Sequence, residues 1–331
     1  MNSVVCCAAF QAKLIDDIEM LTKFKSSKKQ YAKNKLTTNQ KMSLQGKNVI
    51  ITGATSGFGV QMAATLSEAG ANVFIGGRRA DKGMQVANDT KTTFHKVDVA
   101  DETSNKEFFE AARKHFAEST INGVDYILLN AGVEGNNAET MVSNLNIETY
   151  DYIYSVNVRG VILGMQYGTP LLRKGGSFLV TSSAGSIMAF SGNPVYASSK
   201  AAVDSLVRSY AAQFNESTDE HINSLSIVAI NPTLYATEMA DRFVGGSEEA
   251  AHQFAKMVNP SLRLGKAEEL ALIVKSHFEG NLPYKNGDTF VADADTHFPL
   301  NEYFKRMEEA SKSLEKSADA TSPAEQVQHA Q

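Results

Sequence analysis

The 331-residue sequence has only two cysteines, Cys6 and Cys7, and they are adjacent near the N-terminus. No disulfide can therefore join distant parts of a fold that lies beyond them, which suits a reducing compartment, and we expect a cytoplasmic location. The seven histidines are scattered, and none forms a pair at zinc-ligand spacing. We therefore predict no metal site.

The sequence also lacks a run of about 18 apolar residues, so we expect no segment to cross a membrane. Its net charge of −5 at pH 7 argues against nonspecific binding of nucleic acid. No period of about 20–50 residues repeats, which argues against a repeat array.

What the sequence does contain is a glycine-rich segment, TGATSGFG at residues 52–59, directly after the apolar run 49–51. Gly53 permits a tight turn, Gly57 lets the backbone approach a phosphate, and Gly59 lets a helix pack against the strand. A helical pattern and the apolar segment 72–75 follow, which completes a βαβ unit. The candidate phosphate-binding residues are Gly53, Thr55, Ser56, Gly57, Phe58 and Gly59.

The end of the second expected strand bears on cofactor choice. An NAD site usually has an acid there, whereas this chain has Gly77 followed by Arg78 and Arg79, with no acid before Asp81. Two guanidinium groups suit a ribose 2′-phosphate, which they can bind through charge-assisted hydrogen bonds. We therefore predict NADP(H) in preference to NAD(H). The alternative is a pair of solvated arginines in a surface loop.

A second motif places Tyr196 four residues before Lys200, with Ser183 thirteen residues before the tyrosine. On a helix, residues i and i+4 share one face, so the phenol and the ammonium group would lie together. The ammonium favours the phenolate, and we expect it to lower the tyrosine pKa towards the range useful for general acid–base catalysis. The alternative is an ordinary surface pair on an amphipathic helix. Ser182 competes for the serine role, but alternation along a strand points it the other way.

Together these motifs resemble those of the short-chain dehydrogenase/reductase family, over roughly residues 44–295. Leu129-Asn130-Ala131-Gly132 resembles the family's NNAG with Leu129 replacing the first asparagine, and Asn231-Pro232-Thr233 with Thr237 resembles PGxxxT with Thr233 replacing glycine. Segment 291–295 also lacks the family's usual Gly-Gly ending, which bears on subunit contacts.

The resemblance implies roles for further residues. Asn157, Ser183, Tyr196 and Lys200 are the implied catalytic set: Tyr196 exchanges the proton, Ser183 bonds the same oxygen, Lys200 holds the nicotinamide ribose, and Asn157 anchors a relay water. The implied cofactor-binding residues, besides the glycine turn and the two arginines, are Asp98, Val99, Asn130, Ala131, Gly132, Tyr196, Lys200, Pro232, Thr233 and Thr237.

The sequence therefore predicts an NADP(H)-dependent oxidoreductase that interconverts a small-molecule secondary alcohol and a ketone. A reductase of 3-oxoacyl thioesters would use the same residues, and a nucleotide-sensing protein could keep the fold without turnover. The resemblance also implies a homodimer or homotetramer.

Strand and helix signals run without a break from about residue 47 to 291 and predict one doubly wound (Rossmann) α/β domain, residues 43–306, with a mostly parallel seven-stranded sheet. We expect strands near 47–52, 72–76, 93–98, 124–130, 176–182, 223–230 and 288–292, and long helices near 147–172 and 196–215.

The least regular segment, about residues 234–264, carries Met239, Phe243, Phe254 and Met257 at roughly helical intervals. We interpret it as a lid over the substrate; the alternative is a helix face packed on the core.

Both ends lie outside the predicted domain. Residues 1–42 combine an apolar helical face, Phe10 to Leu21, with a lysine-rich stretch, and form either a mobile tail or a docking helix. The polar tail, residues 307–331, is expected to be disordered or a short frayed helix.

Overall fold

The computed structural model describes residues 43–117, 123–188, 190–243 and 248–321. Contacts divide the chain into residues 1–41 and residues 42–331, and everything described below belongs to the second part. The expected N-terminal extension, residues 1–42 with its apolar face, lies outside the described residues.

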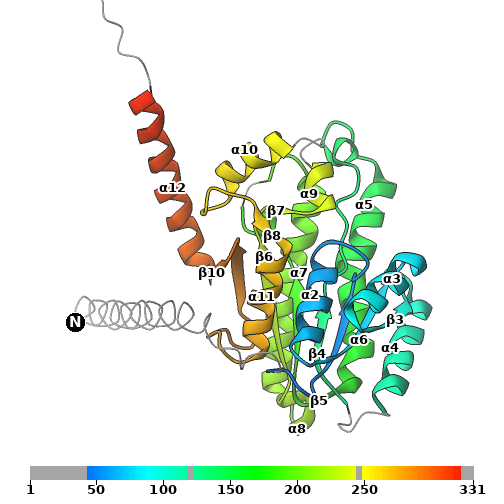
Figure 1. Cartoon of the computed structure of the whole chain (residues 1–331). Coiled ribbons are helices and arrows are strands. Elements are labelled where there is room, and N and C mark those ends of the chain that lie inside the picture. The colour runs from blue at the N-terminus through cyan, green and yellow to red at the C-terminus, as the bar shows by residue number, and fades with distance from the viewer. Residues whose placement is uncertain (1–42, 118–122, 189, 244–247, 322–331) are drawn as a thin grey trace, which may run out of the picture. The chain divides into compact units, whose positions relative to one another are not determined.

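A central eight-stranded sheet has the order β10-β9-β6-β5-β4-β1-β2-β3 (Figure 1). Its strands are β1 (Asn48–Thr52), β2 (Asn72–Gly77), β3 (Thr93–Lys96), β4 (Val124–Leu129), β5 (Leu172–Thr181), β6 (Ser226–Pro232), β9 (Thr289–Asp293) and β10 (Thr296–Pro299). The first seven are parallel, and β10 pairs antiparallel with β9. The predicted doubly wound, mostly parallel sheet is confirmed, with one strand more than the predicted seven.

Helices cover both faces of this sheet, because its central strands are apolar on both sides. All five residues of β1 are buried; Ile50 joins one core, and Val49 and Ile51 join the other. The first core packs against α4 (Glu102–Ala117), α6 (Gly160–Gly168) and α7 (Pro194–Glu216). The second packs against α2 (Gly57–Glu68), α3 (Ala80–Thr90) and α11 (Ala267–Phe278).

The helix expected over 147–172 is interrupted. It consists of α5 (Ile147–Tyr154), a π-helical segment (Ser155–Arg159), α6 and a 3-10 turn (Thr169–Leu171). Strand β5 then begins at Leu172, four residues earlier than predicted, and a register irregularity against β4 accommodates the glycines near its start.

Two shorter departures flank β6. The short helix α8 (Glu220–Asn223) occupies the predicted start of that strand, so β6 begins at Ser226. After β6 the chain forms β7 (Tyr235–Ala236), α9 (Glu238–Phe243), α10 (Glu248–Val258) and β8 (Gly265–Lys266), and β7 pairs with β8 in a separate two-stranded sheet.

The C-terminal segment is more regular than expected. Helix α12 (Leu300–Thr321) has 22 residues and runs through the boundary placed between residues 306 and 307. Its Tyr303 is buried beside Val291 and Phe298, and the tyrosine hydroxyl donates to Val258 O at 3.0 Å. Within the described ranges, we find no helix with the length and apolar character that a membrane span requires.

Candidate active site

A cavity of about 610 Å³ lies at the carboxyl ends of the strands, where the order of the sheet reverses between β1 and β4. Nearly every site residue predicted from sequence lines it. The exceptions are Gly59 and Asn157, which are buried beneath its wall.

The glycine turn forms one end of this cavity. Gly53 has a φ of +70°, and a Cβ added to Gly59 would lie 2.4 Å from Gly53 O, so only glycine fits where α2 meets β1. The side chain of Ser56, the N-cap of α2, makes no capping hydrogen bond. The first N–H groups of α2 therefore face the cavity with a positive helix end, an arrangement suited to a phosphate.

Asn130 joins three strands at the rim of the cavity. Its Nδ2 donates to the carbonyl oxygens of Thr52 and Gly53, both at 3.2 Å, and its Oδ1 accepts from Thr181 at 3.1 Å. Asn130 thereby holds the ends of β1, β4 and β5 in register. Leu129 faces the other way, against Gly164, so the lost family asparagine leaves no gap in this junction.

The loop after β3 forms another part of the wall. Asp98 Oδ1 accepts from Ala100 N at 3.0 Å, which fixes the carboxylate at the loop. Val99 is buried against Gly160. Both residues line the same cavity as the glycine turn.

The two arginines take different positions. Arg79 lies against the glycine turn and donates to Thr55 Oγ1 at 3.1 Å and to Ser56 Oγ at 2.6 Å. Arg78 is exposed and makes one hydrogen bond, to the Tyr152 hydroxyl at 3.0 Å. Arg79 is thus held by the turn, whereas the Arg78 guanidinium can reorient.

Gly77 is tightly enclosed. An added Cβ would lie 2.6 Å from Thr55 Cγ2. An acid at this position would strain the glycine turn, so Gly77→Asp would disturb the turn as well as the cofactor preference and is a poor test of that preference.

Ser183, Tyr196 and Lys200 meet at the other end of the cavity. The Ser183 hydroxyl accepts from Gly185 N at 3.1 Å and lies near enough to the Tyr196 phenol to lower its pKa. Lys200 Nζ lies 5.8 Å from the centre of the tyrosine ring. The ammonium donates to Thr181 O at 2.9 Å. Ser182, the competing serine, instead donates to Lys200 O at 3.2 Å.

Burial shifts the two titratable groups away from their ordinary values. Loss of hydration raises the pKa of Tyr196 to about 12; Ser183 opposes this shift and the charge of Glu134 adds to it. The tyrosine shift is opposite to the direction expected from sequence, because desolvation of the phenolate is the largest contribution. Burial also lowers the pKa of Lys200 to about 8, against the attraction of Asp204.

Asn157 occupies the π-helical segment, a local widening that is frequent at functional sites. Its Oδ1 accepts from Val133 N at 2.8 Å, and its Nδ2 donates to Val133 O at 2.9 Å and to Ser199 at 2.9 Å. The side chain therefore ties the end of β4 to α7, and its polar atoms are already engaged.

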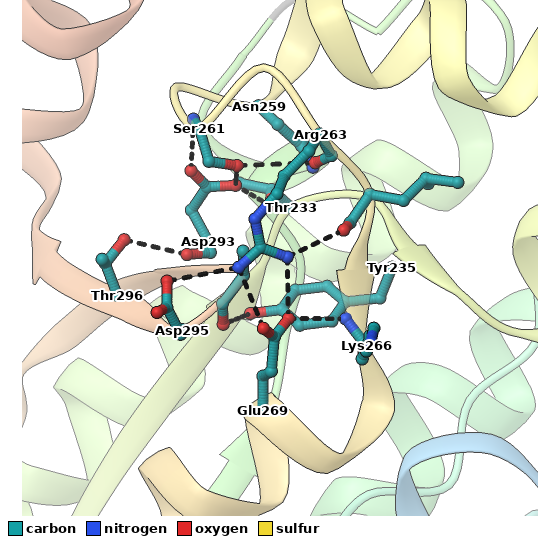
Figure 2. A network of polar contacts seen from close by, with 12 residues as sticks. Thr233, Tyr235, Asn259, Ser261, Arg263, Lys266, Glu269, Asp293, Asp295 and Thr296 are labelled. Carbon is teal, nitrogen blue, oxygen red and sulfur yellow. Dashed lines mark hydrogen bonds and ion pairs between the residues drawn. The ribbon is translucent and has the colours of Figure 1, made fainter.

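The loop after β6 is anchored by the network in Figure 2. Thr233, which replaces a family glycine, donates to Asp293 at 2.8 Å. The buried Asp293 also accepts from Ser261 N at 2.6 Å, and Asn259 bonds both backbone groups of Leu234 at 2.8 Å. Pro232, Thr233 and Thr237 all line the cavity. The network fastens the residues after α10 to the loop after β6.

The expected lid covers part of the cavity. Met239 on α9 and Phe254 on α10 line it, whereas Met257 is 61% exposed and points elsewhere; the Phe243 side chain lies outside the described atoms. Phe254 also packs edge-on against Phe190, with ring centroids 6.4 Å apart.

Sequence reasoning missed two charged residues at this end, Glu134 and Arg242, which form an ion pair at 2.6 Å. They are 108 residues apart and belong to no motif. Only the position of Glu134, two residues after Gly132, could have drawn attention to it.

Comparison with known proteins agrees with this geometry. A family model described as short chain dehydrogenase matches residues 47–246. Levodione reductase from Leifsonia aquatica is 29% identical over 74% of this chain and 92% of that protein. The 2-(R)-hydroxypropyl-CoM dehydrogenase of Xanthobacter autotrophicus is 27% identical over 74% of this chain and 96% of that protein.

A solved structure of levodione reductase matches with a TM-score of 0.65 and 26% identity, covering 76% of this chain and 97% of that one. The fold and the site define a dinucleotide-binding oxidoreductase. The chain belongs to the short-chain dehydrogenase/reductase family, and this membership implies a nicotinamide cofactor.

Proposed function

We propose that the protein is an NADP(H)-dependent oxidoreductase that interconverts a secondary alcohol and a ketone. The observation that carries this proposal is that Ser183, Tyr196 and Lys200 line the same cavity as the glycine turn, with the Lys200 ammonium 5.8 Å from the centre of the Tyr196 ring. The cavity has both a proton donor for the substrate oxygen and a place for a dinucleotide.

The residues present fit a nicotinamide dinucleotide. Gly53 and Gly59 leave the backbone open at the N-terminus of α2, where the N–H groups would hold the pyrophosphate. Asp98 would bind at the adenine end, and Lys200 the nicotinamide ribose. When bound, the nicotinamide gives or takes the hydride.

The protein's own part in the reaction is the movement of a proton. Tyr196 keeps its proton at neutral pH, because burial raises its pKa to about 12. In the direction of reduction the phenol would donate that proton to the carbonyl oxygen, while Ser183 bonds the same oxygen. In oxidation Tyr196 would accept the alcohol proton. Because the polar atoms of Asn157 are engaged by Val133 and Ser199, we assign Asn157 a positioning role.

The preference for NADP(H) rests on the two arginines after β2. Arg78 has a single hydrogen bond to give up, so its guanidinium can turn towards a ribose 2′-phosphate. Arg79 braces the turn itself through Thr55 and Ser56. Gly77 stands where an NAD site usually has an acid, so this position has no carboxylate to repel the 2′-phosphate.

We also propose a homo-oligomer. Ile147 and Tyr150 of α5 and Ile162 of α6 are exposed large apolar side chains on neighbouring helices, a feature typical of association surfaces. Light scattering on the purified chain tests this part of the proposal, and a monomer at micromolar concentration would contradict it.

The test of activity is turnover of a panel of ketones and alcohols, and of a 3-oxoacyl thioester, with NADPH and with NADH. The expected result is turnover of ketones with NADPH. Tyr196→Phe should lose about 10²-fold or more of this rate, while its cofactor affinity stays close to that of the wild type.

Other outcomes would separate the alternatives. Turnover of the thioester alone would indicate the acyl reductase. Binding of nucleotide without turnover of any substrate would indicate a sensing protein. A Tyr196→Phe variant that keeps more than about a tenth of the rate would remove the assigned proton donor.

A further inference from the structure

Glu134 is a nearly buried carboxylate in the wall of the cavity. Its side chain is 8% exposed and lies just after the end of β4. Its carbonyl oxygen accepts from Asn193 Nδ2 at 2.8 Å, and Asn193 Oδ1 accepts from Tyr196 N at 2.9 Å. The same asparagine therefore fixes Glu134 and the first turn of α7, which carries the proton donor.

Arg242 is the partner of this carboxylate. It comes from α9, and its Nε donates to Glu134 Oε1 at 2.6 Å. In the part of the chain that the structure describes, no other side chain is recorded as bonding the Glu134 carboxylate. A buried carboxylate needs such a partner, because an unpaired charge away from water is strongly unfavourable.

Both groups line the cavity that also holds Tyr196, and several apolar side chains line it with them. Met188 and Phe190 come from the segment after β5, and Met239, Phe254 and Val258 from α9 and α10. The negative charge of Glu134 is felt at Tyr196, where it contributes to the raised pKa of the phenol. This end of the cavity thus combines apolar side chains with an ion pair in which the opposite charges of Glu134 and Arg242 offset each other.

We infer that Glu134 and Arg242 determine substrate class: the pair closes this end of the cavity with no net charge and selects uncharged, largely apolar ketones and alcohols. This inference rests on the proposed function and deepens it. Glu134 engages Arg242 through Nε alone, at 2.6 Å. A substrate carboxylate that approached the guanidinium would lie beside the Glu134 carboxylate, and repulsion between the two negative charges would disfavour it. A cationic substrate would be repelled by the positive charge of the Arg242 guanidinium.

The test compares matched pairs of ketones, each pair a neutral aryl or cyclic ketone and its carboxylated derivative, such as acetophenone and 4-acetylbenzoate. The wild type should turn over the neutral member with a kcat/KM at least about tenfold higher. Glu134→Gln frees Arg242 to bind a carboxylate, and should shift the ratio towards the charged member by about tenfold or more.

Two further variants make the test independent of folding defects. Arg242→Gln alone leaves Glu134 unpaired, and should lower the kcat/KM of neutral ketones. The double variant with Glu134→Gln and Arg242→Gln removes both charges, and should recover the preference for neutral ketones. Glu249→Gln, which removes an exposed carboxylate on α10 that does not line the cavity, is the matched control and should leave the ratio unchanged.

The outcomes distinguish the two levels of inference. A wild type that prefers carboxylated ketones, or a Glu134→Gln variant with an unchanged ratio, overturns the specificity role and leaves the proposed function standing. A protein that binds NADPH and turns over no ketone of either kind overturns the proposed function, and the specificity role with it.

Discussion

At the scale of single residues, we expect the buried charge of Lys200 to control how kcat/KM for the nucleotide depends on pH. Its pKa is lowered to about 8 by burial, and Asp204 opposes that shift. The free protein therefore holds the ammonium below about pH 8 and loses it above, whereas Tyr196 keeps its proton throughout this range. We expect kcat/KM for the nucleotide to fall as the pH rises through about 8.

Removing the charge of Asp204 should shift the pH profile in a known direction. Asp204→Asn removes a negative charge that favours the ammonium, so the falling limb should move to lower pH. Asp89→Asn, an exposed carboxylate on α3, should leave the limb in place. Measurement of the pH profile of each variant decides the matter, and a profile that stays flat through pH 8 in the wild type would contradict it.

Removing Arg78 and removing Arg79 should change nucleotide affinity in different ways. Arg78→Ala should weaken NADPH binding at least tenfold, a loss of about 1.4 kcal/mol, and hardly change NADH binding, because the exposed Arg78 guanidinium can exchange its contact with Tyr152 for the phosphate. Arg79→Ala should weaken both nucleotides, because Arg79 braces the turn through Thr55 and Ser56. Calorimetric titration measures both affinities. Equal affinities of the wild type for NADPH and NADH would remove the preference.

The residues that sequence predicted well are those whose geometry is local. The glycine turn depends on Gly53 and Gly59, which are six residues apart. The Tyr196–Lys200 pair lies within about one turn of a single helix. Glu134 and Arg242 escaped prediction because their pairing exists only after the sheet and α9 have formed. The pKa of Tyr196 was misjudged for the same reason: its burial is a property of the whole cavity.

At the scale of elements, Asn157 connects β4 to α7 across the π-helical segment. Asn157→Ala would leave the N–H and C=O groups of Val133 without their partner, and should lower the free energy of unfolding by about 2 kcal/mol or more. Ser199→Ala removes only one of the three hydrogen bonds of Asn157 and should cost about 1 kcal/mol.

Urea unfolding followed by circular dichroism measures both differences. If Asn157→Ala and Ser199→Ala lower the free energy of unfolding by the same small amount, Asn157 does not connect β4 to α7. Cofactor affinity measured alongside separates a loss of stability from a direct loss of the site.

The elements that sequence misplaced have physical explanations. Strand β10 has four residues and ends at Pro299, and a proline is tolerated there because β10 is an edge strand. Hydrophobic periodicity does not reveal the widening at Ser155–Arg159, because a five-residue π segment is too short to establish a period of its own. The first turns of α12 are secured by Tyr303, a single buried aromatic in a polar segment.

At the scale of the whole molecule, the strands and site residues that the structure describes all lie within residues 43–306. A truncated chain spanning 43–306 keeps Tyr303 and should bind nucleotide and turn over like the full chain. A chain ending at Pro299 loses Tyr303 and its bond to Val258, and should be less stable by about 3–5 kcal/mol, the usual cost of deleting a large buried aromatic.

Thermal unfolding of the two truncated chains and the full chain measures this difference. Equal stability of the two shorter chains would show that Tyr303 is dispensable. A large loss on removing only residues 1–42 would instead assign a docking role to that segment.

The segment interpreted as a lid, residues 234–264, is attached differently at its two ends. After α10, hydrogen bonds join Asn259 and Ser261 to Leu234 and Asp293. At the other end, ion pairs hold α9: Arg242 pairs with Glu134, and Glu238 pairs with Arg79 at 3.8 Å and Lys82 at 3.9 Å.

Dissolved salt screens exposed ion pairs such as those of Glu238 and has little effect on buried hydrogen bonds. If the segment opens as a lid, we therefore expect the hydrogen-bonded attachment after α10 to be the hinge, α9 to be the part that moves, and higher ionic strength to favour opening.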